Sequence, residues 1–234
     1  MLEVRDLDAF YDDSQVLHRI SVSVQAGERV AILGRNGAGK STFLKAIMNA
    51  GPTARGSLSF EGRPLERLPN FRRARLGLCL VPEDRRIFTH LTALENIEFG
   101  CYGASGRANR QAAEDLIQSF PMLVPLRDRP GGQMSGGQQQ LLALVRGLAA
   151  RPKMMLLDEP TEGLAPVIVE QMAKDVLASC SANEMALLLC EQNIWFARAC
   201  TNRVYVLGTG RVVFEGTWPE FDADLKIREK YLAA

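Results

Sequence analysis

The chain contains 234 residues, of which 47% are hydrophobic, so it can form one large domain or two small ones with an ample core. Its formal net charge of +1 gives no indication of a nucleic acid or an acidic membrane surface as a partner. The longest apolar runs, such as residues 186–190, fall far short of the ~20 residues that span a bilayer, and acids near the start argue against a signal peptide. We therefore expect a soluble protein, with its five cysteines reduced because none shows C-x-x-C spacing.

The N-terminal residues 2–30 predict antiparallel strands. Residues 2–7 and 20–24 alternate apolar and polar side chains, and residues 26–28 predict a turn. Tyr11 lies between these strands in a polar loop. Its flat ring can stack on a nucleotide base, and the alternative is a partly buried loop tyrosine without a binding role.

A phosphate-binding loop follows, because the sequence G-R-N-G-A-G-K-S-T fits the pattern G-x-x-x-x-G-K-[ST]. The apolar residues 29–33 predict a buried strand before it, and residues 42–50 have a helical period that ends at Gly51. Glycines let the backbone wrap closely around phosphate, and the helix N-terminus directs N–H groups toward it. Lys40 is expected to reach the β- and γ-phosphates, and Ser41 is expected to bind Mg²⁺. The residues of this loop are Gly34, Arg35, Asn36, Gly37, Ala38, Gly39, Lys40, Ser41 and Thr42.

The next segments alternate strands and loops. Residues 56–62 predict a strand and a turn, and residues 76–81 predict a buried strand that ends at Pro82. The intervening residues 63–75 are rich in arginine. We interpret them as a solvated basic face, the alternative being a surface that binds anions or a membrane. A charged loop follows at residues 83–86.

A helical insertion is predicted over roughly residues 84–150. A capping box at residues 92–95 opens a helix that reaches about residue 99. Residues 100–106 predict a break, and residues 108–120 predict a second helix. The surrounding chain alternates strand and helix, so this segment is expected to be a separate helical subdomain.

A glycine-rich helix start begins with Ser135. Together with Gln138 it forms a second capping box, and the helix is expected to end near Ala150. Gly136 and Gly137 leave backbone N–H groups available to an anion. The pattern alone is common at helix starts, so its weight comes from the neighbouring motifs.

Two acids end a predicted core strand at residues 154–159. A carboxylate at the C-terminal end of a parallel strand lies at the mouth of the sheet, beside the phosphate loop. Asp158 therefore fits a ligand of Mg²⁺, and Glu159 fits the group that polarises an attacking water. The alternative is that both acids only mark the end of the strand.

The C-terminal part continues the alternation of helix and strand. Residues 167–179 predict a helix, and residues 186–190 predict another buried strand. Residues 203–207 and 211–214 predict a hairpin, and a capping box at residues 217–220 opens a last helix.

The order of these motifs resembles the nucleotide-binding domain of an ATP-binding cassette (ABC) protein, over essentially the whole chain. The resemblance rests on the phosphate loop, on Ser135-Gly136-Gly137-Gln138 and on Leu156-Leu157-Asp158-Glu159-Pro160. It implies an α/β fold, namely a P-loop NTPase (RecA-like) core with an N-terminal antiparallel β subdomain and an inserted α-helical signature subdomain. Residues 1–234 would form a single ABC ATP-binding domain, with the helical subdomain at roughly residues 84–150.

Several stretches are similar to the ATP-binding subunits of branched-chain amino acid and amide importers. They are residues 33–40, 81–83, 86–88, 95–96, 163–166 and 190–193. This resemblance implies an ATP-hydrolysing subunit that powers solute import, with branched-chain amino acids or related amides as the solute. Urea importers are similar as well and remain an alternative.

The family resemblance also implies which residues bind ATP. Tyr11 occupies the position of the adenine-stacking aromatic residue. The signature residues Ser135, Gly136, Gly137 and Gln138 would contact the γ-phosphate of ATP held by the partner subunit. The active site would therefore be shared across a head-to-tail dimer.

Further roles concern Mg²⁺ and catalysis. Ser41, Glu83 and Asp158 would bind Mg²⁺, while Glu159 and Gln192 would act in catalysis. Glu83 stands where the family usually has Gln, and Gln192 replaces the switch His. Other departures from the usual pattern are Met134 for Leu, Asp84 for Gly and Ala165 for Asp.

The partners implied are membrane permease subunits, which residues 83–100 would touch, and a second ABC ATPase subunit that is either a copy or a paralogue. A solute-binding protein would act indirectly, and no nucleic acid is expected. The protein would lie peripherally on the cytoplasmic side of the inner or plasma membrane. A non-transport cassette ATPase acting on ribosomes or DNA is the less favoured alternative, because such proteins usually carry two cassettes or long insertions. An exporter would usually carry a fused membrane domain.

Overall fold

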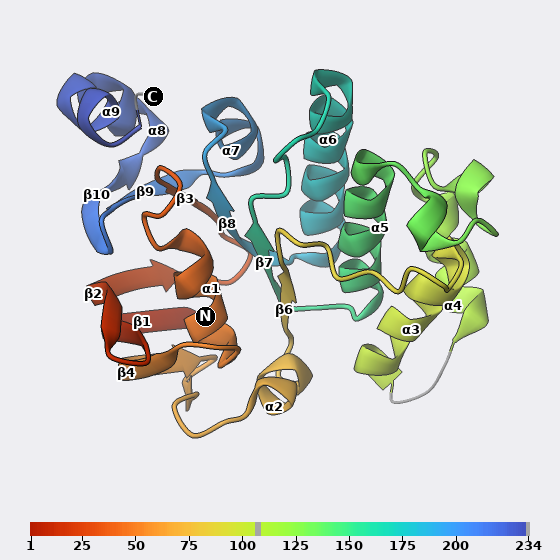
Figure 1. Ribbon diagram of the computed structural model, residues 1–234, viewed down its shortest axis with the longest axis horizontal. Coiled ribbons are helices and arrows are strands. Elements are labelled where there is room, and N and C mark those ends of the chain that lie inside the picture. Colours follow the sequence, from red (N-terminus) through yellow and green to blue (C-terminus); the bar gives the residue numbers. More distant parts are fainter. Residues whose placement is uncertain (106–108, 233–234) are drawn as a thin grey trace.

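The computed structural model describes residues 1–105 and 109–232, in which two β-sheets are surrounded by helices (Figure 1). The predicted α/β class is confirmed. The strands are β1 (Leu2–Tyr11), β2 (Ser14–Val24), β3 (Arg29–Leu33), β4 (Thr53–Phe60), β5 (Arg63–Pro64), β6 (Leu78–Val81), β7 (Met154–Asp158), β8 (Ala186–Glu191), β9 (Arg203–Gly208) and β10 (Arg211–Thr217). The helices are α1 (Lys40–Met48), α2 (Asn70–Arg75), α3 (Ala93–Ser105), α4 (Arg110–Gln118), α5 (Gly136–Ala149), α6 (Pro166–Asn183), α7 (Ile194–Cys200), α8 (Trp218–Ala223) and α9 (Leu225–Tyr231), with short 3-10 helices η1 (Val124–Leu126) and η2 (Gly131–Gln133).

The central sheet brings the ends of three strands together. Its order is β10-β9-β3-β8-β7-β6, with β10 antiparallel to β9 and the other strands parallel. Strands β7 and β8 are buried along their whole lengths, as expected for parallel strands covered on both faces. In the register of the sheet, Leu33 lies beside Glu191 and Asp158 lies beside Cys190. The carboxyl ends of β3, β8 and β7 therefore meet at one edge.

Each face of this sheet has its own apolar core. On one face, α1 lies between the central sheet and the smaller sheet, whose order is β2-β1-β4-β5. Helices α5, α6 and α7 contribute buried side chains to the core on the opposite face. Successive side chains of β8 point to opposite faces of the sheet, so Leu187 lies in one core and Leu188 in the other.

Helix α3 continues through Gly100, so the predicted break at residues 100–106 is wrong wherever the structure describes it. A Cβ on Gly100 would lie 2.3 Å from the carbonyl oxygen of Arg146 and 2.9 Å from the Cβ of Ala149. This glycine therefore allows α3 to lie close against α5 and does not end the helix. Residues 106–108, which belong to the predicted break and the predicted second helix, lie outside the described residues.

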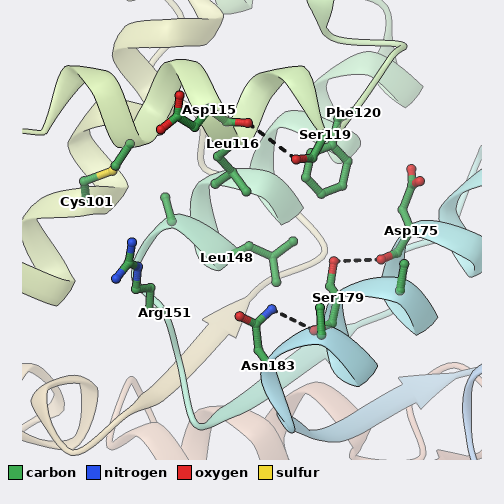
Figure 2. Close-up of a pocket in the computed structure, with 14 residues that line it drawn as sticks. Cys101, Asp115, Leu116, Ser119, Phe120, Leu148, Arg151, Asp175, Ser179 and Asn183 are labelled. Carbon is green, nitrogen blue, oxygen red and sulfur yellow. Dashed lines mark hydrogen bonds between the residues drawn. The ribbon is translucent and has the colours of Figure 1, made fainter.

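Helices α3 and α4 lie to one side of the central sheet, beside α5 and far from the smaller sheet (Figure 1). A cavity of about 550 Å³ lies between α4, α5 and α6, and Leu116, Leu148 and Ser179 are among the residues that line it (Figure 2). Helix α4 is thus separated from α6 by open space at this position. The division of the chain at roughly residues 84–150 remains a prediction.

The predicted capping boxes are present at three helix starts. Hydrogen bonds join Thr92 with Glu95, Ser135 with Gln138, and Thr217 with Glu220. Other ends differ from the prediction, since β1 continues to Tyr11 and α1 ends at Met48, with Asn49 in the left-handed region at φ 51°. Asparagine tolerates this conformation and serves as the cap that was expected of Gly51.

The burial of the cysteines and the length of the helices both bear on membrane and redox context. Four of the five cysteines are buried, and Cys79 is partly exposed. In the part of the chain that the structure describes, no helix is both long enough and apolar enough to cross a membrane.

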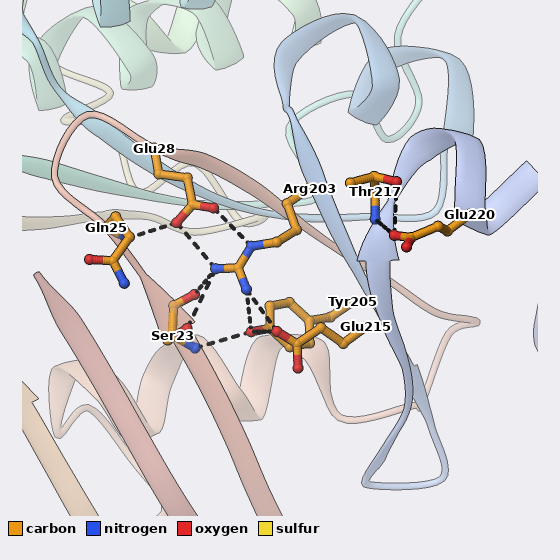
Figure 3. A network of polar contacts seen from close by, with 8 residues as sticks. All are labelled: Ser23, Gln25, Glu28, Arg203, Tyr205, Glu215, Thr217 and Glu220. Atoms are coloured by element: carbon orange, nitrogen blue, oxygen red, sulfur yellow. Dashed lines mark hydrogen bonds and ion pairs between the residues drawn. The ribbon is translucent and has the colours of Figure 1, made fainter.

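Arg203 connects the two sheets (Figure 3). Its guanidinium donates to Glu28 before β3 at 2.8 Å, to the carbonyl oxygen of Ser23 in β2 at 2.6 Å, and to Glu215 in β10 at 2.7 Å. It also donates to the hydroxyl of Tyr205 at 3.0 Å. One side chain of β9 therefore holds the smaller sheet against the edge of the central sheet.

Arg73 is an exception to the predicted solvated basic face. It is 3% exposed, and its guanidinium donates to the carbonyl oxygens of Ala46, Ile47, Leu65 and Leu68. The last carbonyl groups of a helix lack partners within that helix. Arg73 supplies such partners to the end of α1 from the neighbouring helix α2, and its positive charge is favourable there.

Replacing Arg73 with Met tests this role, because Met retains much of the apolar volume and none of the donors. Several buried carbonyl oxygens would lose a charged donor, so we expect the free energy of unfolding to fall by about 3 kcal/mol. Urea denaturation measures the change. The control is Arg72→Met at an exposed position of the same helix, with an expected change within about 0.5 kcal/mol. Equal changes in the two variants would contradict the assigned role.

Candidate active site

The phosphate loop joins β3 to α1, as predicted. Gly37 and Gly39 have φ values of 78° and 106°, which side chains other than glycine rarely adopt. A Cβ on Gly34 would lie 2.6 Å from the carbonyl oxygen of Leu207, so this glycine permits the close approach of β9. Helix α1 begins directly at the loop, and the unpaired N–H groups of its first turn are available to an anion.

Side chains of the loop divide into an exposed tip and a buried base. Arg35 and Asn36 are exposed together with Gly37, whereas Ala38 and Thr42 are buried. The tip is therefore accessible to a ligand, while the base anchors the loop to α1.

Lys40 is 3% exposed, and its ammonium group lies over the loop. The Nζ atom donates to the carbonyl oxygens of Gly34 at 2.7 Å and Arg35 at 3.0 Å. It also forms an ion pair with Oε1 of Glu159 at 3.1 Å. The structure thus brings the cation of the first motif against the second acid of the strand-end motif.

Ser41 and Asp158 are in direct contact. The Oγ of Ser41 donates to Oδ1 of Asp158 at 2.9 Å, and Asp158 is 1% exposed. Burial raises the pKa of Asp158 to about 6, and the negative charge of Glu159 acts in the same direction, while the hydrogen bond from Ser41 opposes them. Hydroxyl and carboxylate oxygens are ligands that Mg²⁺ prefers, and a nearby cation favours the charged form of a buried carboxylate. This pair of side chains fits a magnesium site.

Glu83 lies among other acids. Its pKa is raised, first by a hydrogen bond with Glu162 and then by burial and by the charges of Glu162, Glu159 and Asp158. Within residues 1–105 and 109–232, no three His, Cys, Asp or Glu side chains form a preformed metal cage. Mg²⁺ commonly binds through one or two carboxylates together with water and phosphate, so this arrangement is compatible with it. The role of Glu83 as a ligand remains a prediction.

Glu159 has an unusual backbone conformation for a residue other than glycine. Its φ value is 43°, in the left-handed region, and its N–H donates to the carbonyl oxygen of Cys190 at 2.9 Å. Such strain persists only when the surroundings enforce it, and it is common at functional sites. The strand end of β7 and the neighbouring β8 therefore hold the Glu159 carboxylate beside Lys40.

Glu191 was not among the predicted site residues, although it ends β8 much as Asp158 ends β7. It is 2% exposed, and burial raises its pKa against the opposing effect of its hydrogen bonds. Its carboxylate accepts hydrogen bonds from Thr161 and from the N–H groups of Gln192 and Asn193. An acid at the end of a fully buried strand was the sequence signal that could have identified it.

Gln192 lies directly after the strand end, and its side chain is exposed. Its position beyond β8 places it at the edge of the sheet where β3 and β7 also end. A contact with phosphate remains a prediction.

The signature residues form the start of α5. Ser135 accepts the N–H of Gln138 at 3.4 Å, and the Gln138 side chain accepts the N–H of Ser135 at 2.9 Å. Ser135 is exposed, and a Cβ on Gly136 would lie 3.2 Å from the guanidinium of Arg85. The capping box thus occupies the N–H groups of Ser135 and Gln138, and the Arg85 guanidinium lies beside the half-exposed Gly136. The expected contact of these residues, including Gly137, with the ATP of a partner subunit remains a prediction.

Tyr11 is the last residue of β1 and is 40% exposed. Its ring lies beside Gly51, where an added Cβ would be 3.7 Å from the ring. Gly51 follows the C-terminal end of α1, whereas the phosphate loop lies at the N-terminal end. Val16 is nearer the loop, with its Cγ1 3.7 Å from a Cβ placed on Gly39. Stacking of Tyr11 on adenine remains a prediction.

Comparisons with known proteins agree with this geometry. A family model described as ABC transporter matches residues 17–162, more than half of the chain. The chain is 37% identical to the high-affinity branched-chain amino acid transport ATP-binding protein BraG of Pseudomonas aeruginosa, and the match covers 99% of each protein. It is 34% identical to the glutamine transport ATP-binding protein GlnQ of Escherichia coli, over 92% of this chain and 91% of that protein. It is 28% identical to the lipopolysaccharide export system ATP-binding protein LptB of Haemophilus influenzae, over 99% of this chain and 97% of that protein.

Solved structures share the fold. An ATP-binding cassette of an ABC transporter in its ADP conformation superposes with a TM-score of 0.83 at 26% identity, covering 98% of this chain and 97% of that one. A dimeric ATP-binding cassette in a post-hydrolysis state, bound to ADP and Pi, superposes with a TM-score of 0.83 at 23% identity, covering 93% and 98%. The predicted P-loop NTPase fold and the family resemblance are confirmed. The chain therefore belongs to the ABC transporter family and is an ATP-binding protein that hydrolyses ATP.

Proposed function

We propose that this ATPase powers the import of branched-chain amino acids or related amides through a membrane permease. The observation that carries the proposal is the 37% identity to BraG over 99% of both chains. A branched-chain amino acid transport ATP-binding protein LivF of Archaeoglobus fulgidus adds support, at 30% identity over 93% of this chain. Urea remains an alternative solute. Glutamine transport is named for a relative at 34% identity, and lipopolysaccharide export for one at 28% identity.

The likeness to LptB bears on the direction of transport. That protein belongs to an export system, yet this chain covers 97% of its length. Similarity over this length of chain therefore does not by itself distinguish import from export. Import is favoured here because the relatives named for amino acid transport are the more similar ones.

In the proposed mechanism, Lys40 binds the β- and γ-phosphates of ATP. Its ammonium group already has carbonyl partners at Gly34 and Arg35, so it stays fixed over the loop. An incoming phosphate competes with Glu159 for this cation. Loss of the ion pair leaves the Glu159 carboxylate free to accept a proton from the attacking water.

Ser41 and Asp158 would hold Mg²⁺, with Glu83 as a further ligand. The ion would neutralise charge that develops on the phosphate oxygens. Asp158 is well suited to this task because its burial disfavours the charged carboxylate until a cation is nearby. Gln192 would donate a hydrogen bond to the γ-phosphate from its side-chain amide.

A second ATPase subunit would complete the site. Ser135, Gly136, Gly137 and Gln138 form an exposed or half-exposed helix start whose N–H groups suit a phosphate. In a head-to-tail dimer, this surface would contact the ATP of the partner, which is either a copy of this chain or a paralogue. ATP binding would then close the dimer, and hydrolysis would reopen it.

The permease would bind to residues 83–100 on the flank of α3. Phe88 and Phe99 are exposed there, 4.6 Å apart between ring centroids, and the exposed Tyr102 just beyond this range lies beside Phe99. They border a hollow of about 370 Å³ that reaches Gly147 of α5. An apolar segment of a permease loop would fit it, which would hold the protein at the cytoplasmic face of the membrane. A solute-binding protein would act through the permease, and no nucleic acid is required.

Reconstitution with the membrane permease that co-purifies with this protein tests the solute. Proteoliposomes that contain both proteins and the cognate binding protein should import labelled leucine when ATP is supplied, and unlabelled valine or isoleucine should compete. Uptake of urea or glutamine without uptake of leucine would contradict the proposed solute class. Export of a lipid or polysaccharide by the same assembly would contradict import.

Glu159→Gln should retain ATP binding and lose turnover by a factor on the order of 10² or more. The amide fills the same space but cannot accept the proton of the attacking water. Steady-state phosphate release gives the rate, and equilibrium binding of ATP gives the affinity. The control is Glu170→Gln, at an exposed position of α6, which should retain most of the turnover. Normal phosphate release by Glu159→Gln would refute its catalytic role.

Asp158→Asn should stabilise the nucleotide-free protein near neutral pH. The pKa of Asp158 is raised from 3.8 to about 6 in the folded protein, so its ionisation disfavours folding. This cost is absent below pH ~4, grows as the pH rises to about 6, and then stays constant. Asn carries no charge, so the variant should gain about 3 kcal/mol of unfolding free energy at pH ~7.5 and little near pH ~4.

Denaturation curves at both pH values measure this gain. The exposed Asp13→Asn serves as the control and should show little change at either pH. A loss of stability in Asp158→Asn at neutral pH would show that its charged form is already compensated.

A further inference from the structure

One buried carboxylate joins the two loops that carry Glu159 and Gln192. The Oε1 atom of Glu191 accepts hydrogen bonds from the hydroxyl of Thr161 at 2.6 Å and from its N–H at 3.2 Å. The Oε2 atom accepts the N–H groups of Gln192 at 2.9 Å and Asn193 at 2.8 Å. Each oxygen of the carboxylate therefore serves a different loop.

The chemistry of Glu191 suits this bridging position. It is 2% exposed, and these hydrogen bonds come from neutral donors. A buried carboxylate is costly unless it is well hydrogen-bonded. A carboxylate offers acceptors on both oxygens, whereas an amide of the same shape replaces one acceptor with a donor. Only the acid can satisfy both loops at once.

Both loops depend on this anchor for their shape. Thr161 lies two residues beyond Glu159, whose left-handed backbone requires support from its surroundings. On the other side, the N–H groups of Gln192 and Asn193 are fixed just before α7. The backbone of Glu159 is also joined to Cys190, the residue before Glu191. The end of β8 thus fixes the two loops relative to each other.

We propose that Glu191 is a positioning residue that holds Glu159 and Gln192 at a fixed separation around the γ-phosphate. It acts through Thr161 and through the backbone of Gln192, and it does not contact the nucleotide. The inference rests on the proposed roles of Glu159 and Gln192. It predicts that Glu191 affects the rate of hydrolysis much more than the binding of ATP.

Glu191→Gln tests the proposal with the smallest change in shape. Its amide group would face the N–H donors of one loop, so that loop would shift. We expect kcat to fall about 10- to 100-fold, the scale of a displacement near 1 Å, while KM and ATP affinity change less than about twofold. A wild-type kcat, or a loss of ATP affinity as large as the loss of kcat, would overturn the proposal.

Thr161 provides a second test that leaves the carboxylate in place. Thr161→Val removes the hydroxyl donor and should lower kcat about 3- to 10-fold at unchanged KM, whereas Thr161→Ser retains the donor and should restore kcat. Glu191→Gln and Thr161→Val should combine to less than the product of their separate effects, because they break the same link. If Glu191→Gln does not fold, the Thr161 pair decides the question: equal kcat values for Val and Ser would overturn the proposal.

Two controls separate positioning from other causes. Asp224→Ala removes the cap of α9, which takes no part in the hydrogen bonds of Glu191, and should lower the melting temperature without changing kcat. If Asp224→Ala and Glu191→Gln lose the same amount of stability and also the same fraction of kcat, the loss of kcat is a general effect of destabilisation. That result would overturn the proposal.

Glu159→Gln, assayed in parallel, separates the catalytic role of Glu159 from the positioning role of Glu191. If it hydrolyses ATP normally, the proposed function of Glu159 fails; if it is inactive while Glu191→Gln keeps its kcat, only the positioning role of Glu191 fails.

Discussion

The parallel pairing of β3, β8 and β7 is the constraint on which the site depends. Pairing of Leu33 with Glu191, and of Asp158 with Cys190, fixes the positions at which these strands end. At this edge the phosphate loop follows β3, Asp158 ends β7 and is followed by Glu159, and Gln192 follows β8. Apolar side chains on both faces of the sheet prevent a shift in register, since a shift by one residue would exchange the two cores. Packing far from this edge therefore sets the distances between the proposed catalytic groups.

Charge is distributed unevenly over this edge. Asp158, Glu159 and Glu83 influence one another, and Lys40 forms its ion pair with only one of them, Glu159. The raised pKa of Asp158 shows that a buried acid here is held at a cost. A nucleotide that arrives with its divalent cation brings both signs of charge at once. In the proposed mechanism, the cation would compensate the acids, and the phosphates would replace Glu159 as the partner of Lys40.

Features that depend on neighbouring residues were predictable from the sequence. The phosphate loop, the strand that ends in Asp158 and the capping box of Ser135 and Gln138 are encoded within a few residues, and the structure shows the conformations expected for them. Features that depend on distant partners were not. Gly100 lies inside a helix and does not end it, because α5 packs too closely there for a side chain. Arg73 is buried because the carbonyl groups at the end of α1 need donors.

The distinction between features set by neighbouring residues and features set by distant partners also applies within the site. Glu191 bonds to a loop 30 residues earlier in the chain, and no local pattern marks that pairing. Tyr11 is chemically suited to stack on adenine and its ring lies beside Gly51, so its role stays a prediction that depends on where the base lies. The sequence identifies which side chains are chemically suitable, and the tertiary fold decides which of them meet.

The position of β3 has a consequence for how the chain is made. This early strand lies inside the central sheet, where Arg29 pairs with Leu187 and Val30 with Arg203. At a synthesis rate of about 5–20 residues per second, β3 leaves the ribosome on the order of ten seconds before either partner strand exists. During that interval both of its edges are open to pairing with other nascent chains. A fragment that stopped before β8 would contain the phosphate loop, the signature residues and both strand-end acids, yet it would lack the strands that turn these motifs into a site.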